Sequence, residues 1–190
     1  MVRETRRAFC GRLMAFGAAG LFGGQAGLDK FLLPAPPCKD DLTPAVGTEA
    51  GFRAGAPVRG SLVEAGMAGQ KMTLTGFVTG LTCGRIKGAR VDFWQADAAG
   101  RLDATGFRLR GAALTDKDGR YSIETIIPGQ VGNRAKRIHV RVQPPGKRAL
   151  STVLYFPNDA AAERDRDFKK QLLLRHTGAN VFQFDFLLDV

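Results

Sequence analysis

The sequence predicts an all-β fold, an antiparallel β-sandwich with one short helix in its C-terminal region. The first observation is a series of short runs in which apolar and polar residues alternate. The second is that Gly, Pro and Asp-Gly separate these runs in a chain with 24 Gly and 9 Pro. The third is the length of 190 residues, which suits one domain with a sizeable core. Short strands joined by turns are typical of a sandwich with Greek-key connections.

Six runs of this kind begin after residue 70. In the second run, Val91 and Phe93 fall on one face and Asp92 and Trp94 on the other, because successive strand residues point to opposite sides. The runs are KMTLTGFV (71–78), ARVDFWQA (89–96), RYSIETII (120–127), RIHVRVQ (137–143), STVLYF (151–156) and NVFQFDFLLDV (180–190).

One turn and one helix interrupt the strands. The string TDKDG predicts a hairpin turn in which Asp116 bonds to the local backbone and Gly119 supplies a positive φ. The helix is expected over 160–175, where strong helix formers follow Asp159 as N-cap and precede Gly178.

Residues 1–26 are expected to be an export signal and not part of the fold. The string TRRAF at residues 5–9 resembles a twin-arginine signal, and a short Gly- and Ala-rich apolar stretch follows it. That stretch is too short to span a bilayer, and cleavage after Ala26 is expected. A periplasmic or secreted location follows, with no transmembrane segment after cleavage.

Residues 27–60 are Pro-, Gly- and Ala-rich and predict an extended arm, followed by the folded domain over 61–190. Removal of the signal leaves two cysteines, Cys38 and Cys83, which an oxidising compartment would join. Such a bridge would stabilise the fold by about 4 kcal/mol in the chain-entropy model. The alternative is a pair of unrelated thiols.

The formal charge of +10 suits anionic small molecules or acidic partners. The positive residues are spread along the whole chain, and no stripe of basic and aromatic residues resembles a stacking platform. Nucleic acid is therefore not expected as a partner.

Four strings, read in order, resemble the intradiol ring-cleavage dioxygenases, the family that includes catechol and protocatechuate dioxygenases. The resemblance runs from about Thr43 to Asp159 and implies a β-sandwich. The strings are GARVDFWQADAAGRL (88–102), RGAALTDKDGRYSIETIIPGQV (110–131), NRAKRIHVRV (133–142) and STVLYFPND (151–159).

In that family two tyrosines and two histidines hold a ferric ion. The resemblance places Leu102 and Val131 at the two tyrosine positions and Arg137 at the first histidine position, so that only His139 remains. Aliphatic side chains have no lone pair, and a guanidinium stays protonated. One unit charge about 4 Å from another costs roughly 4 kcal/mol at an effective dielectric constant of about 20, and a trivalent ion about three times that. The resemblance therefore implies a lost iron site and no cofactor.

A ferric site rebuilt from the remaining tyrosines and histidines would need several distant residues to converge. Tyr121 and Tyr155 are expected to pack in the core, and His176 is expected near the end of the predicted helix, where a cation is favourable. Trp94 is expected to pack under the former metal site, Gln95 to form buried hydrogen bonds, and Asp97 to fix the following loop.

The candidate binding residues are Arg134, Arg137 and His139, joined by Arg101. Arg134 matches an arginine that active members of the family use near the substrate. Two interpretations stay open. These residues form a solvated or ion-paired strand face, or they form an anion site in which cations replace the ferric ion as the attractor of a small aromatic acid.

The leading hypothesis is an exported, iron-free member of this family that acts as a non-catalytic binding or partner subunit, in a homo-oligomer or with a related dioxygenase chain. The alternative is an active dioxygenase that cleaves catechol-type aromatics with Fe(III) in a rebuilt site. A structural envelope protein is a third, weaker hypothesis.

Overall fold

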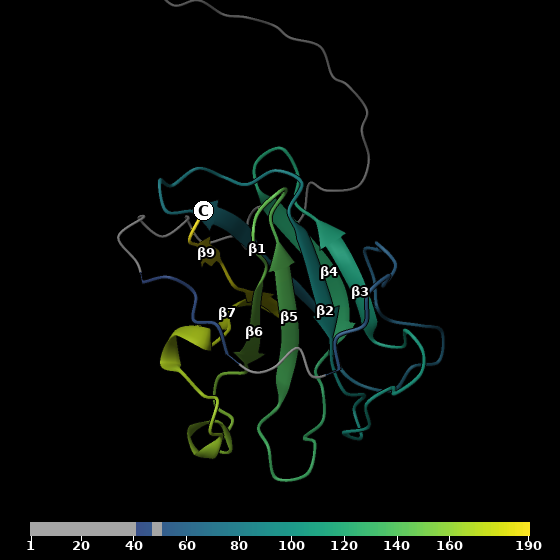
Figure 1. The fold of residues 1–190 in the computed structure, drawn as a ribbon. Helices are drawn as coiled ribbons and strands as arrows, with labels where there is room; N and C mark the ends of the chain where they lie inside the picture. The colour runs from purple at the N-terminus through teal and green to yellow at the C-terminus, as the bar shows by residue number, and fades with distance from the viewer. Residues whose placement is uncertain (1–40, 47–50) are drawn as a thin grey trace, which may run out of the picture.

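The computed structural model describes residues 41–46 and 51–190 of the chain. Nine strands and two 3₁₀ helices account for its regular structure (Figure 1). The strands are β1 (Lys71–Gly80), β2 (Arg90–Trp94), β3 (Arg110–Leu114), β4 (Arg120–Ile126), β5 (Arg137–Gln143), β6 (Leu150–Tyr155), β7 (Arg175–Gly178), β8 (Val181–Gln183) and β9 (Phe186–Leu188). The 3₁₀ helices are η2 (Ala162–Arg164) and η3 (Lys170–Leu172).

The strands form two sheets, as the predicted sandwich requires. One sheet has the order β4-β1-β8-β7, with β9 also paired to β1, and the other has the order β3-β2-β5-β6. All pairs are antiparallel except β1 with β8 and β1 with β9, which are parallel. The all-β sandwich is confirmed, whereas the expectation of purely antiparallel pairing is wrong for the C-terminal strands.

The change of partner along β1 depends on Gly76. Residues 73–75 pair with β8, and residues 78–80 pair with β9. Between them the backbone of Phe184 approaches so closely that a Cβ on Gly76 would lie 1.7 Å from the Phe184 carbonyl oxygen. A residue without a side chain is therefore required at this point.

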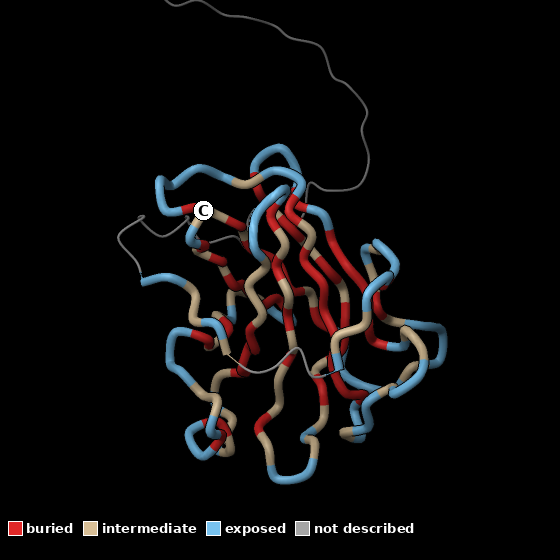
Figure 2. Tube along the Cα trace, in the orientation of Figure 1, coloured by how far each residue is buried: buried red, intermediate tan, exposed pale blue. Residues whose placement is uncertain are grey.

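The core fills the space between the two sheets. Figure 2 shows the buried stretches running through the strands, with exposed residues gathered in the loops. Tyr121 is 1% exposed, and its hydroxyl donates to the Phe184 carbonyl at 2.8 Å, which confirms its expected structural role. The largest fully buried side chains, besides Tyr121, are Tyr155, Phe93, Phe186, Leu62, Met72, Leu74, Leu109, Ile123, Ile126, Ile138 and Leu154.

The predicted helix over 160–175 is wrong. The structure has two single 3₁₀ turns there, and β7 begins at Arg175. Leu172 and Leu174 are buried, and the Leu174 N–H donates to the Tyr155 carbonyl at 2.8 Å, so the segment follows the edge of β6. Tertiary contacts outweigh local propensity here because the helix preference of each residue is only a fraction of a kcal/mol.

All six predicted strand runs are strands, but β3 and β7 were not predicted. The hairpin turn before β4 is confirmed, because Asp116 Oδ1 accepts the N–H groups of Asp118 and Arg120 and Gly119 has φ +70°. His176 lies in β7, not in a helix, and stacks on Phe182 with ring centroids 4.8 Å apart.

The described part of the predicted arm covers sheet edges. The Val46 N–H donates to the Ser151 carbonyl beside β6, and the Arg59 N–H donates to the Ala112 carbonyl beside β3. Cys83 is disulfide-bonded, whereas Cys38 lies outside the described residues, as does the predicted signal over 1–26. The pairing of the two cysteines therefore stays a prediction.

Within residues 41–46 and 51–190, no helix is long and apolar enough to cross a membrane.

Candidate functional site

The predicted binding residues of β5 point away from the core, on the outer face of the sheet β3-β2-β5-β6. Burial alternates along β5, so that Arg137, His139 and Arg141 are half-buried while the residues between them are buried. This alternation confirms the predicted strand faces. The register places His139 opposite Trp94 of β2 on one side and Val153 of β6 on the other.

His139 lies beside Trp94 and is uncharged at neutral pH. The two rings stack with centroids 5.4 Å apart and an interplanar angle of 14°. Burial, together with the charges of Arg137, Arg134 and Arg110, lowers the pKa of His139 to about 4. Its imidazole makes no hydrogen bond or ion pair with another residue in the described ranges.

Arg134 and Arg137 are both bonded to Asp165. Arg134 donates from Nε and Nη2 to the two carboxylate oxygens at 2.9 and 2.5 Å, and Arg137 donates from Nη1 to Oδ2 at 2.8 Å. Nη2 of Arg134 also bonds Asp167 Oδ2 at 2.5 Å. An ion-paired face, the first of the two interpretations, is what the structure shows at these two arginines.

The Asp165 carboxylate has further donors and no exposed surface. Tyr155 donates its hydroxyl to Oδ1 at 3.2 Å, and the Asp167 N–H donates to the same oxygen at 3.2 Å. Burial would raise the pKa of Asp165, but the bonds from Arg134 and the charge of Arg137 outweigh it, so the pKa falls to about 2. Burial and the Asp165 charge raise the pKa of Tyr155 to about 12. The pair is therefore a carboxylate and a neutral phenol.

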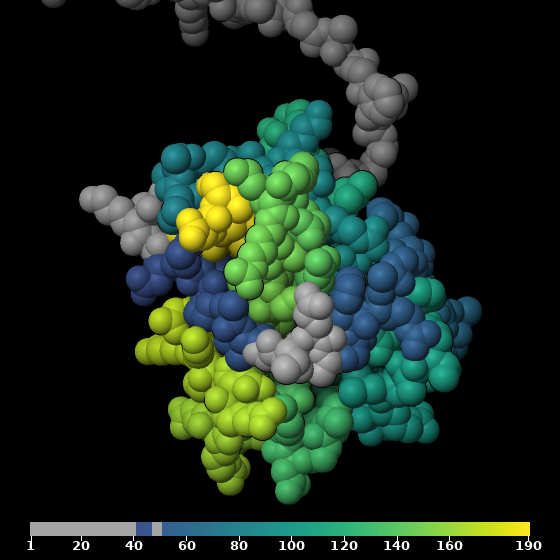
Figure 3. Space-filling model, in the orientation of Figure 1, coloured from purple at the N-terminus to yellow at the C-terminus, as the bar shows by residue number. Residues whose placement is uncertain are grey.

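The segments that carry these residues lie side by side at one end of the sandwich, as Figure 3 shows for the yellow-green segment around 160–172 and the green segment leading into β5. Phe168 covers Tyr155 from the side, with ring centroids 5.3 Å apart in an edge arrangement.

Arg101 pairs elsewhere. Its guanidinium bonds Asp97 at 2.9–3.0 Å, and its side chain is 76% exposed. Asp97 Oδ1 also accepts the N–H groups of Ala99 and Arg101, which is the loop-fixing role predicted for it. Arg110, which was not predicted, takes the place expected for Arg101 among the charges that act on His139.

The two positions that the resemblance aligns with tyrosine ligands lie on loops in contact. A Cβ on Gly100, which has φ +79°, would lie 2.0 Å from the Gln130 carbonyl oxygen, so the loops meet backbone to backbone. Leu102 lies two residues after Gly100 and is 45% exposed, and Val131 lies directly after Gln130 and is half-buried. Neither side chain carries a donor atom.

Trp94 is covered by the N-terminal arm. Phe52 packs on it with centroids 5.7 Å apart, and a Cβ on Gly51 would lie 3.4 Å from the indole nitrogen. Nη1 of Arg110 bonds the Gly51 carbonyl and holds the arm there. Trp94 is 3% exposed, in agreement with the predicted packing role. Gln95 donates to the Ile126 carbonyl at 2.7 Å, which confirms its buried hydrogen bonding.

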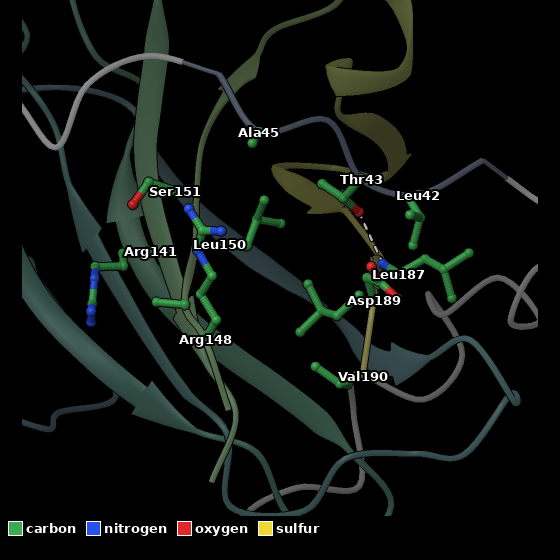
Figure 4. A pocket seen from close by; sticks show the side chains of 12 residues that line it. Leu42, Thr43, Ala45, Arg141, Arg148, Leu150, Ser151, Leu187, Asp189 and Val190 are labelled. Carbon is green, nitrogen blue, oxygen red and sulfur yellow. Dashed lines mark hydrogen bonds between the residues drawn. The ribbon is translucent and has the colours of Figure 1, made fainter. Parts of the chain in front are cut away.

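A cavity of about 590 Å³ lies between the arm and the C-terminus (Figure 4). Leu42, Leu150 and Leu187 line it together with Arg148, and the Leu187 N–H donates to the Thr43 hydroxyl at 2.9 Å across one wall. None of the predicted binding residues lines this cavity.

Comparison with known proteins identifies the family. A family model described as "Dioxygenase" matches residues 50–180. The chain belongs to the intradiol dioxygenase family. It is 30% identical to 6-chlorohydroxyquinol 1,2-dioxygenase of Cupriavidus pinatubonensis over 166 residues. The aligned region covers 71% of this chain and 60% of that protein. The chain spans about half the length of the curated relatives it matches.

Solved structures of the family share the fold. The dioxygenase domain of a dioxygenase–carbohydrate-binding fusion from Streptomyces sp. SirexAA-E has a TM-score of 0.75 and 38% identity, covering 79% of this chain and 99% of that one. The intradiol ring-cleavage dioxygenase of Tetranychus urticae has a TM-score of 0.70 and 22% identity, covering 79% and 95%. The second likeness shows the fold alone.

The donors at the family positions do not fit the ferric ion on which the family normally depends. The side chains of Leu102 and Val131 offer no donor atom, the guanidinium of Arg137 has no acceptor and is bonded to Asp165, and only His139 offers a lone pair. A hard trivalent ion needs several anionic oxygen or imidazole ligands. Among the described residues, no group of three or more His, Cys, Asp and Glu side chains is placed to hold a metal.

Sequence reasoning missed Asp165, Asp167 and Arg110. The two aspartates fall within the predicted helix over 160–175, which does not form, and no role was predicted for Arg110. The one available signal was the presence of Arg134 and Arg137 at positions that the resemblance aligns with the family's site, since partly buried cations require carboxylates from elsewhere in the chain.

Proposed function

We propose that this chain is an iron-free member of the intradiol dioxygenase family that acts as a binding or partner subunit and does not cleave aromatic rings. One observation carries the proposal. Arg137, at a family histidine position, is bonded at 2.8 Å to Asp165, whose side chain has no exposed surface. An internal ion pair thus takes the place of a metal ligand.

The ligand class proposed is a small aromatic or other organic acid, because Arg134 and Arg137 already bind a carboxylate, that of Asp165, near the stacked rings of Trp94 and His139. The alternative partner is a second protein chain, either another copy or a related dioxygenase subunit. With either partner, the lack of metal-ligand atoms at Leu102, Val131 and Arg137 supports a non-catalytic role for this chain.

Metal content and oxygen chemistry test the proposal together. The full chain, produced with iron in excess, is expected to contain no stoichiometric iron, to lack a visible tyrosinate-to-iron band, and to consume no oxygen with catechol, hydroxyquinol or protocatechuate. The curated relative 6-chlorohydroxyquinol 1,2-dioxygenase, prepared in parallel, serves as the positive control. Bound iron with oxygen-dependent ring opening would establish the alternative, an active dioxygenase with a rebuilt site.

We also propose export by the twin-arginine route, supported by the string TRRAF at residues 5–9. A fusion of residues 1–40 to a reporter protein should reach the periplasm, and the double variant Arg6→Lys/Arg7→Lys should stay in the cytoplasm. Equal export of both fusions would contradict the proposal.

A further inference from the structure

The Asp165 cluster has the features of a ligand site that the chain itself has filled. We propose that Arg134, Arg137 and Tyr155 form a carboxylate-binding site whose built-in occupant is Asp165, so that an external organic carboxylate binds by displacing this side chain. The inference rests on the proposed binding function and adds how ligand binding at that site is controlled.

The donors are arranged as a complete carboxylate receptor. Arg134 presents Nε and Nη2 to the two oxygens of one carboxylate, which is the bidentate geometry that a guanidinium forms with a carboxylate. Arg137 and the Tyr155 hydroxyl each add one bond, one to each oxygen. Three side chains from the loop before β5, from β5 and from β6 therefore converge on a single carboxylate group.

The charges of the site require an anion. Two guanidiniums meet there, and the side chains of Arg134 and Arg137 are only 33% and 11% exposed. Asp167 is 23% exposed, and its carboxylate pairs with Arg134 and with the exposed Arg166. No ion pair joins it to Arg137, so among the described residues Arg137 depends on Asp165 for its carboxylate partner. Removal of that carboxylate leaves positive charge that water solvates poorly, and a small carboxylate is the complementary ligand.

Asp165 is tethered in a way that permits exchange. It lies between η2 and η3, in a segment that the structure holds by single 3₁₀ turns. Its neighbours Arg164 and Arg166 are exposed, whereas Ala162 and Leu172 on either side are buried. A tethered group competes at an effective concentration of about millimolar or higher. The built-in carboxylate should therefore weaken the binding of an external one without abolishing it.

Two variants of Asp165 distinguish the effect of the space that its side chain fills from the effect of its negative charge. Asp165→Ala removes the carboxylate and leaves room for another, while Asp165→Asn removes the charge but keeps the side-chain volume. Trp94 is the one tryptophan of the chain, and it stacks on His139, two residues from Arg137, so its fluorescence reports on the site. The probes are formate, acetate and benzoate, with chloride at equal ionic strength as the control salt.

The Asp165→Ala protein is expected to bind formate or acetate at least tenfold more tightly than the wild type, with a rise in melting temperature that chloride does not give. The Asp165→Asn protein is expected to show no such gain, because its amide fills the space. Equal affinity of wild type and Asp165→Ala, or an equal response to chloride, would overturn the proposal.

A second measurement uses the wild-type protein and does not depend on a variant. If benzoate displaces Asp165, trypsin should cleave after Arg164 or Arg166 at least threefold faster at saturating benzoate. An unchanged cleavage rate would also overturn the proposal. Iron found in the ligand-free protein would instead contradict the proposed function, so the two failures are distinguishable.

Discussion

Two aspartates each hold a loop beside the positions that the resemblance aligns with the family's metal ligands, but their partners lie at very different distances along the chain. The Asp97 side chain accepts hydrogen bonds from the backbone of Ala99 and from the backbone and side chain of Arg101, all within four residues, and Arg108 adds a longer ion pair at 3.8 Å. Asp165 bonds Arg137 and Arg134, which lie 28 and 31 residues away. The first arrangement is built by its own loop, whereas the second exists only when β5, β6 and the 159–172 segment have assembled.

The two sites also differ in exposure. Both aspartate side chains are buried, that of Asp97 being 7% exposed and that of Asp165 not at all, but their arginine partners differ: Arg101 is 76% exposed and Arg137 is 11% exposed. Water can replace the partner of a surface charge but not that of a buried one. The comparison thus predicts that loss of Asp165 costs far more stability than loss of the pair between Asp97 and Arg101.

The largest effect is expected for Asp165→Ala, which should lower the free energy of unfolding by about 3–5 kcal/mol in urea titrations. The nearly buried guanidinium of Arg137 loses its carboxylate partner, and Arg134 loses its bidentate one. The control is Asp118→Ala, since Asp118 is 64% exposed and paired to Lys117 on the surface. That control should change the free energy of unfolding by less than about 0.5 kcal/mol. An equally small decrease in the free energy of unfolding for Asp165→Ala would contradict the predicted difference between the two sites.

Gly100→Ala tests the contact between the loops that carry Leu102 and Val131. The added Cβ would lie 2.0 Å from the Gln130 carbonyl oxygen in a backbone with φ +79°, so we expect a loss of about 2–4 kcal/mol. Gly132→Ala is the matched control, because Gly132 also has positive φ, +58°, but its Cβ would meet open space. Its loss should be about 1 kcal/mol, and equal losses would show that the close contact contributes nothing.

The pH dependence of stability should be dominated by His139 between pH 6.5 and about 4. The pKa of His139 is lowered from 6.5 to about 4, so on acidification the unfolded chain takes up the proton first. Stability that is present above pH 6.5 is then lost as the pH falls to about 4, by roughly 2–3 kcal/mol. In His139→Gln, urea titrations at several pH values should show little change in the free energy of unfolding over this pH interval. An unchanged profile would contradict the argument.

The smallest changes in stability are expected in the loop that Asp97 holds. Asp97→Ala removes two backbone bonds and should cost about 1–2 kcal/mol, whereas Arg101→Ala should cost less than about 0.5 kcal/mol because its guanidinium is exposed. Thermal or urea denaturation of both variants checks this ranking. A loss for Asp97→Ala as large as that for Asp165→Ala would show that a locally built cluster can match one assembled by the fold.

Much of the fold was predictable because strand alternation and turn chemistry are local. The alternation of β5 put Arg137 and His139 on one face, and the turn at Asp116 could be inferred from five consecutive residues. The same local reasoning failed over 160–175. There the preference for a helix yields to buried Leu172 and Leu174 and to the bonds that Asp165 makes with distant arginines.

The parallel pairs of β1 with β8 and β9 were also beyond prediction. Run 180–190 was identified as a strand, but its alternation says nothing about which strand it joins or in which direction. The close approach of Phe184 to Gly76 fixes that choice, and this contact joins residues more than 100 positions apart.

By itself, the sequence determined the sandwich, the family resemblance and the shortage of metal donors at Leu102, Val131 and Arg137. Each of these depends on the identity of a residue or on its nearest neighbours. Only the tertiary structure decided that Asp165 pairs with Arg134 and Arg137, that the arm covers Trp94, and that His139 stays uncharged. Those outcomes depend on which charges and rings lie within a few ångströms of one another after folding, and Coulomb and packing forces act on distance in space, not on distance along the chain.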